Sequence, residues 1–157
     1  LAFRLSTRGS PQPFDGTEIL MAADKSEGDG ALRQDFPGGW EGDSSDVLRG
    51  KGLSPTQQEA LAYTRRLLTW RRGNKTVTRG KLRHYSPRDG VYIYTRSLDG
   101  SCVMELLNGT SEERLVNLST LPLPAGTRIQ REVTTDRIIT SDERILTLPP
   151  HEVIILE

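Results

Sequence analysis

The sequence is poor in the residues that most often bind metals or form cross-links. Among its 157 residues are one cysteine and two histidines, and only 6% of the residues are aromatic. Because Cys102 stands alone, an internal disulfide and a multi-cysteine zinc site are both excluded. His84 and His151 are too few for the usual zinc-dependent catalysis. We therefore predict no metal site and no cofactor, and the redox state of the compartment stays open.

An excess of charge of one sign is also lacking. Lys plus Arg and Asp plus Glu each number 21, so the formal net charge is zero. A surface for nucleic acid or for anionic membranes needs an excess of basic residues, so we predict neither partner. No apolar run is long enough to span a bilayer, and no signal peptide is recognisable. A neutral polymer is a more natural partner for this composition.

The chain begins in the middle of a pattern. LAFRLSTRG is typical of the end of a helix that stops at Gly9, with Leu1, Ala2 and Leu5 on one stripe. A helix this short does not form on its own. We therefore expect that a preceding part of the protein is missing from this sequence.

Composition and side-chain periodicity divide the chain into three parts. Residues 1–53 are rich in Gly, Asp and Ser, which predicts mostly loop. Residues 54–74 form the clearest predicted helix, because Ser54 and Gln57 match a capping box and Pro55 occupies the first helical position. Residues 75–157 are rich in β-forming residues that alternate with a period of 2. The expected organisation is one compact domain with an appendage.

Eight short β-rich runs, separated by turn signals such as Asp99-Gly100 and Asn108-Gly109, fill the last part of the chain. They have no helices between them, which favours an antiparallel, Greek-key-like sandwich over a parallel sheet. The predicted fold class is therefore mainly β. The runs are KLRHYS, GVYIYTR, SCVMELLN, RLVNL, TRIQREV, DRIIT, RILTL and EVIILE.

The segment RQDFPGGWEGD, from Arg33 to Asp43, is the strongest candidate for a binding loop. Phe36 and Trp40 offer flat apolar faces, Arg33 and Asp35 offer directional hydrogen bonds, and the Pro-Gly-Gly sequence fixes a bend. This combination suits a sugar ring. The alternative is a well-packed surface loop without a ligand, which is the commoner use of such a sequence.

These motifs together resemble the C-terminal end of an α-amylase superfamily glycosidase, of the cyclomaltodextrinase or neopullulanase-like group found in Bacteroidetes. Gly9, Pro11, Gly16 and Glu18 match the family pattern around the eighth strand of a (β/α)8 barrel, and RQDFPGGWEGD is specific to the subgroup. The resemblance implies that residues 1–53 are the barrel end, that 54–74 are the last barrel helix, and that 75–157 are the C-terminal β-sandwich.

The resemblance also implies a function for the parent enzyme. Such enzymes are retaining hydrolases of α-1,4-glucans or cyclodextrins, and they use an aspartate nucleophile, a glutamate acid/base and a second aspartate. The family places all three upstream of Leu1, so no residue here is expected to be catalytic, and the chain alone is expected to be inactive. The missing barrel would be its partner, and Arg33, Asp35, Phe36 and Trp40 would lie near the substrate.

Three points stay open, namely the function, the compartment and the origin of three unusual residues. The alternative function is a non-catalytic carbohydrate-binding or interaction β-module, and the compartment is undefined, although the family suggests the bacterial periplasm or cytoplasm.

Ser10, Pro13 and Asp15 replace residues that are apolar or aromatic in the family, which would weaken a barrel strand. One hypothesis is that these changes keep an isolated C-terminal piece soluble, and the other is a natural, degenerate homologue.

Overall fold

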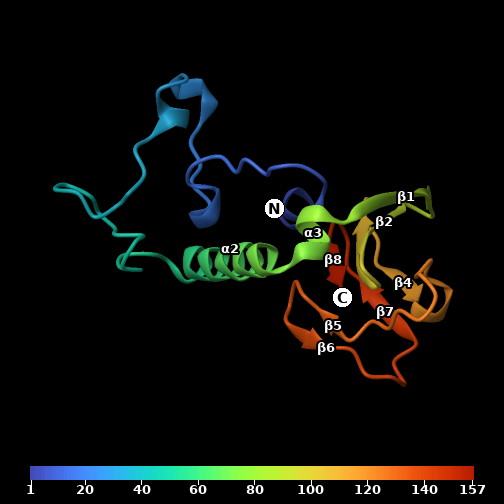
Figure 1. Cartoon of the computed structure of the whole chain (residues 1–157). Helices are drawn as coiled ribbons and strands as arrows, with labels where there is room; N and C mark the ends of the chain where they lie inside the picture. Colours follow the sequence, from blue (N-terminus) through green and yellow to red (C-terminus); the bar gives the residue numbers. More distant parts are fainter. The chain divides into compact units, whose positions relative to one another are not determined.

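The computed structural model covers residues 1–157, and these form two compact units. The first, called here the β unit, consists of Leu1–Pro11 and Leu67–Glu157. The second, called here the loop unit, is Gln12–Arg66. Both are drawn in Figure 1 and are described separately below. None of the helices combines the length and the apolar character needed to cross a membrane.

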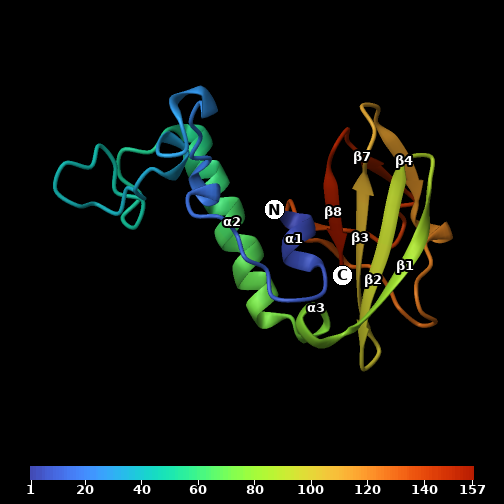
Figure 2. The same cartoon turned by 90° about the horizontal axis from the view of Figure 1, so that it is seen from above.

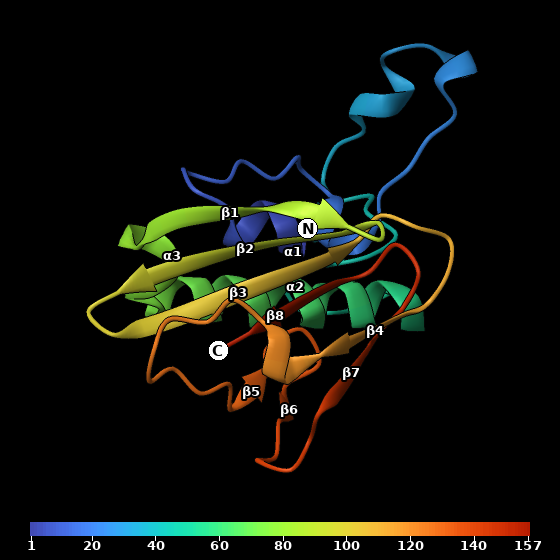
Figure 3. The same ribbon diagram turned by 90° about the vertical axis from the view of Figure 1, so that its right-hand side faces the viewer.

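The β unit contains eight strands, as the alternation of apolar residues predicts. They form a six-stranded sheet in the order β1-β2-β3-β8-β5-β6 and a two-stranded sheet of β4 and β7, and all pairs are antiparallel. Figure 3 shows β1, β2, β3 and β8 side by side. The predicted fold class, mainly β with an antiparallel sandwich of about eight strands, is confirmed. The strands are β1 Lys81–Arg88, β2 Val91–Leu98, β3 Ser101–Asn108, β4 Arg114–Asn117, β5 Arg131–Glu132, β6 Arg137–Ile138, β7 Ile145–Leu148 and β8 Val153–Leu156.

Tight turns join the first three strands. Asp99 and Gly100 have φ values of 48° and 82°, the left-handed pair that a two-residue hairpin turn of type I′ requires. The register of Leu98 opposite Ser101 follows directly from that turn. This Asp-Gly turn therefore fixes which face of β2 and β3 each side chain occupies.

The core of the β unit lies between its two sheets. Met104, Leu106 and Leu156 come from the large sheet and are fully buried against Leu146 and Leu148 of the small one. These residues are two positions apart within their strands, so each strand turns one face inward. Burial of these side chains is the main source of stability for the sandwich.

Two short helices pack on the outer face of the large sheet. Helix α1 (Ala2–Ser6) contacts β3 and β8, and α3 (Lys75–Arg79) contacts β2 and β3. Figure 2 shows both helices beside the large sheet. Within α1, Ala2 and Leu5 are buried, and Arg71 donates hydrogen bonds to the carbonyl oxygens of Leu5 and Gly9. The helix expected before Gly9 is thus present, but it is only about one turn long and ends at Ser6.

The loop unit is mostly irregular. It contains the 3-10 turns η1 (Thr17–Ile19), η2 (Lys25–Glu27) and η3 (Ala31–Arg33), together with the first part of helix α2 (Pro55–Gly73). Helix α2 has the predicted capping box, because Ser54 and Gln57 exchange backbone-to-side-chain hydrogen bonds of 3.0 and 3.3 Å. The small apolar core of the unit consists of Ile19, Val47, Leu53 and Leu61, with Met21 and Phe36 packed against it.

No strand forms where the resemblance implies the eighth barrel strand. Residues 10–16 have no regular structure, and the first strand of the chain is β1. A parallel barrel strand is held by ladders to neighbours on both sides, and the chain supplies neither neighbour. Pro11 and Pro13 also lack the N–H groups that such ladders need. The assignment of residues 1–53 and 54–74 to a barrel stays a prediction.

Candidate functional site

Hydrogen bonds within the loop from Arg33 to Asp43 hold its shape. The carboxylate of Asp43 accepts hydrogen bonds from the N–H groups of Gly39 and Trp40, both at 2.9 Å. Gly39 has a φ of 89°, and a Cβ added there would lie 2.6 Å from the carboxyl carbon of Asp46. The Pro-Gly-Gly turn therefore needs glycine at this position, as the sequence suggested.

Asp46 anchors the other side of this loop. Its backbone forms a bridge to Lys51 through two hydrogen bonds of 2.8 Å, and its buried side chain accepts hydrogen bonds from the Arg49 N–H and guanidinium at 3.0 and 2.8 Å. The Arg49 hydrogen bond holds the pKa of the Asp46 carboxyl below its usual range. The side chains of Asp43 and Asp46 thus stabilise the conformation of the loop.

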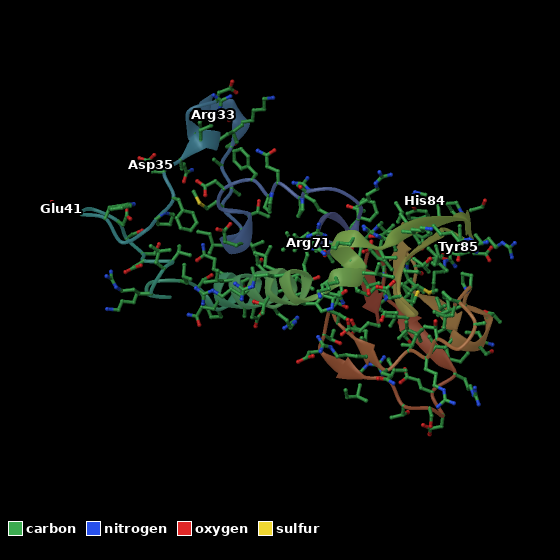
Figure 4. The ribbon with its side chains drawn as sticks, viewed as in Figure 1. Arg33, Asp35, Glu41, Arg71, His84 and Tyr85 are labelled. Atoms are coloured by element: carbon green, nitrogen blue, oxygen red, sulfur yellow. The ribbon has the colours of Figure 1, made fainter.

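Three of the four predicted substrate-proximal residues lie around one hollow. Arg33, Asp35 and Phe36 line a cavity of about 350 Å³, together with Phe14 and Asp15. Figure 4 shows Arg33 and Asp35 on the same arm of the loop, away from the tip that carries Glu41. The structure thus brings the charged pair and one aromatic side chain to the same place.

The two aromatic residues of the loop have different environments. Phe36 is half-buried and packs against the apolar core of the loop unit, so part of its ring is committed to packing. Trp40 does not line the hollow and is 72% exposed. Phe14, which sequence reasoning did not select as a site residue, is 66% exposed and does line it. Phe14 lies in the irregular segment after Pro13, where no sequence pattern indicates which side chains line a site.

The hollow can bind polar groups of a ligand through its charged side chains and an apolar face through an aromatic ring. Arg33 and Asp35 are exposed, and neither side chain has a partner within the chain. A guanidinium and a carboxylate beside an aromatic ring can bind the hydroxyl groups and the apolar face of a sugar. No group of three or more His, Cys, Asp or Glu residues is arranged to hold a metal ion.

The β unit holds a polar cluster that sequence reasoning missed. Glu105 on β3 is 1% exposed, and its carboxylate accepts hydrogen bonds from Tyr94 at 2.7 Å and from Ser6 of α1. Burial raises the pKa of Glu105 to about 8 and also raises the pKa of Tyr94. The alternation of side chains along β3 could have indicated this cluster, because it turns Glu105 away from the core that Met104 and Leu106 enter. Nothing in the sequence paired it with Ser6.

The aromatic side chains of β1 and β2 contact one another. Tyr94 is 2% exposed, so it cannot stack on a sugar. Tyr92 is half-buried, with the His84 ring stacked on it at 6.1 Å between centroids and hydrogen-bonded to its hydroxyl. His84 and Tyr85 follow one another on β1 and therefore belong to opposite faces of the sheet (Figure 4). Tyr92 and Tyr94 therefore serve packing.

Comparison with known proteins gives one matching domain family and several structures of similar fold. A family model described as the cyclo-malto-dextrinase C-terminal domain matches residues 82–157. Similar solved structures, each covering 99% of this chain, are AmyP in complex with maltose (20% identity, TM-score 0.68), the Nostoc punctiforme debranching enzyme soaked with acarbose (17%, 0.64) and trehalulose synthase MutB from Pseudomonas mesoacidophila MX-45 (18%, 0.63). The chain spans 32%, 27% and 36% of those chains, or about a third of each.

Proposed function

Because residues 82–157 belong to the cyclomaltodextrinase C-terminal domain family, and the chain has the fold of the corresponding part of α-amylase family enzymes, we propose that it is the C-terminal portion of a hydrolase of α-1,4-glucans or cyclodextrins. The recognition made from the sequence is confirmed at the level of this family. The match of residues 82–157 is the single observation that carries the proposal, since it coincides with the strands of the β unit.

In this proposal the chain does not itself cleave the glucan. A retaining glycosidase needs a general acid whose pKa is raised and a nucleophilic carboxylate about 5 Å from it. Glu105 has a raised pKa, but it is 1% exposed beneath Ser6 and Tyr94, so a substrate cannot reach it. The carboxylates beside the hollow, Asp15 and Asp35, are both exposed to solvent.

The loop unit would supply a contact for the substrate. Arg33 and Asp35 would hydrogen-bond the hydroxyl groups of one glucose unit, and the phenyl ring of Phe14 or Phe36 would lie along its apolar face. Trp40, which is exposed and outside the hollow, would contact a different part of the chain of sugars. In a barrel of this type the loops that follow the strands carry the binding residues, which supports such a role.

The β unit would have a supporting role. Its buried sandwich core provides a stable body on whose outer face α1 and α3 are fixed. A missing (β/α)8 barrel is the partner that this proposal requires, because the catalytic carboxylates of the family belong to it. The finer assignment, to cyclomaltodextrinase or neopullulanase activity, is part of the same proposal.

A binding titration distinguishes this function from that of a separate carbohydrate-binding module. ¹⁵N-labelled chain is titrated with maltoheptaose and with β-cyclodextrin, and amide shifts are followed together with tryptophan fluorescence. The proposal predicts no saturable binding below millimolar ligand, or weak shifts confined to the loop unit that Arg33→Gln removes and Arg65→Gln, on an exposed part of α2, leaves intact. Saturable shifts on the strands of the β unit would instead support the module.

A further inference from the structure

A second site with unusual chemistry lies within the β unit, under helix α1. Glu105 Oε2 accepts hydrogen bonds from the Tyr94 hydroxyl and from Ser6, while Glu105 Oε1 is buried and has no hydrogen-bond partner. The three side chains are at most 2% exposed. A carboxylate anion in this position would carry its charge without water and with one oxygen unsatisfied, which is unfavourable.

The neutral carboxylic acid fits the same arrangement better. The Ser6 hydroxyl lies 2.7 Å from the carbonyl oxygen of Ala2 as well as near Glu105, but it has only one hydrogen to donate. When Glu105 is protonated, its own O–H can bond to Ser6, and Ser6 is then free to donate to the Ala2 backbone. When Glu105 is ionised, Ser6 and Tyr94 both donate to the carboxylate, and the hydrogen bond from Ser6 to the Ala2 carbonyl within α1 is lost.

No basic side chain compensates a negative charge there. Arg4 belongs to the same short helix as Ser6 and is exposed. Arg71 of α2 is bonded to the carbonyls of Leu5 and Gly9, and Arg96 of β2 is bonded to the carbonyl of Gly80.

The other elements packed against the site contribute little charge. On β2 and β1, Tyr92 and His84 are bonded to one another, and His84 lies 6.4 Å from Tyr94 between ring centroids. Strand β8 places Ile155 directly opposite Glu105, so it contributes no charge. The charge state of Glu105 is therefore set mainly by its burial.

We propose that Glu105, Tyr94 and Ser6 form a proton-controlled latch, which holds α1 on the large sheet while the Glu105 carboxyl is neutral and releases α1 when that carboxyl ionises. Burial raises the pKa of Glu105 to about 8, against the opposing effect of the Tyr94 hydrogen bond, so the latch is closed at neutral pH and opens in mildly alkaline solution.

Helix α1 is suited to such a release. It has five residues, and a helix of that length is not stable in water without the surface on which it packs. Ala2 and Leu5 are its buried apolar side chains, and Ser6 is its only buried polar one. Ionisation therefore weakens α1 from within, through the lost Ser6–Ala2 hydrogen bond, and favours its release, because opening lets water reach the buried anion.

Tryptic cleavage after Arg4 measures the release directly. Arg4 lies inside α1, so cleavage between Arg4 and Leu5 requires the helix to open. Its rate is followed by mass spectrometry from pH 6.5 to 9.5, and each rate is divided by that of the free peptide LAFRLSTRG, which removes the pH dependence of trypsin. We expect the ratio to rise at least tenfold, with a midpoint near the titration of Glu105 followed by ¹³C NMR of its side-chain carboxyl.

Two variants complete the test. Glu105→Gln keeps the shape without an ionisable group, so its ratio should not change with pH; Glu113→Gln, on an exposed turn, should behave as the unaltered chain does. A ratio in the unaltered chain that stays constant across this range, or a Glu105 carboxyl that titrates below pH 6, would overturn the latch. These measurements need no variant, so they decide the question even if Glu105→Gln fails to fold. They are also independent of any result with glucans.

Discussion

Replacing Asn108 by aspartate should cost the β unit much of its stability. Asn108, at the end of β3, is 1% exposed, and its amide NH₂ donates to the carbonyl oxygens of Glu112, Leu148 and Pro149 at 2.7, 3.1 and 2.9 Å. Leu148 ends β7, so this one side chain ties the large sheet to the small one. Asn108→Asp preserves the size of the side chain but removes both hydrogens that these carbonyls share.

The expected magnitude follows from the number of groups left unsatisfied. Each buried acceptor without a partner costs about 1 to 3 kcal/mol, and a carboxylate that faces carbonyl oxygens adds repulsion. The other oxygen keeps its hydrogen bonds from the N–H and hydroxyl of Thr110, at 2.9 and 2.7 Å, so part of the local structure survives. We expect a loss of about 3 to 5 kcal/mol, a large share of the roughly 5 to 15 kcal/mol typical of a domain.

Urea unfolding at pH 7, followed by the fluorescence of buried Trp70, measures this loss. Asn117→Asp is the matched control, because Asn117 is exposed and uses only its carbonyl oxygen, which accepts from Ser119 N–H and hydroxyl at 3.0 and 2.7 Å. A carboxylate can accept the same bonds, so the control should stay within about 0.5 kcal/mol of the unaltered chain. An equal loss of unfolding free energy in Asn108→Asp and Asn117→Asp would contradict this prediction.

Three further predictions concern single contacts. Ser54→Ala removes the cap of α2 and should lower its stability by about 1 kcal/mol, seen as reduced helical signal in urea by circular dichroism; an unchanged midpoint would contradict the cap. Gly90→Ala should cost about 1 to 3 kcal/mol and more than Gly100→Ala, since both have positive φ but only Gly90 would place a Cβ against Thr110, at 2.1 Å; equal midpoints in thermal unfolding would refute this. The unfolding free energy of the β unit should fall by up to about 1.4 kcal/mol per pH unit as the pH rises from 4.5 to about 8, because folded Glu105 keeps a proton that the unfolded chain releases; the same slope in Glu105→Gln would contradict it.

Local chemistry made most of the fold predictable. The eight strands follow from alternation and turn residues, and the Asp99-Gly100 turn has the left-handed backbone that its sequence favours. The start of α2 follows from Ser54 and Gln57. The sheet order was not predictable, because β8 lies between β3 and β5 through contacts between residues far apart in the chain. Turn chemistry acts over a few residues and does not specify such pairings.

The candidate site was predictable only in part, for a similar reason. Arg33, Asp35 and Phe36 are close in sequence and line one hollow, whereas Trp40 lies beyond the Pro-Gly-Gly turn and is turned out to solvent. The Glu105 cluster was missed entirely. It brings together Ser6 and Glu105, which are 99 residues apart, and nothing in their local sequences indicates that they meet.

We propose that this chain carries the supporting and substrate-contacting end of a glycoside hydrolase without its catalytic carboxylates. The most direct test is to incubate the purified chain with maltoheptaose at neutral pH and to follow the formation of new reducing ends. We expect no release above that of buffer alone. Release that increases in proportion to the concentration of the chain, and that is lost in Asp35→Asn, would contradict it by placing a catalytic carboxylate within residues 1–157.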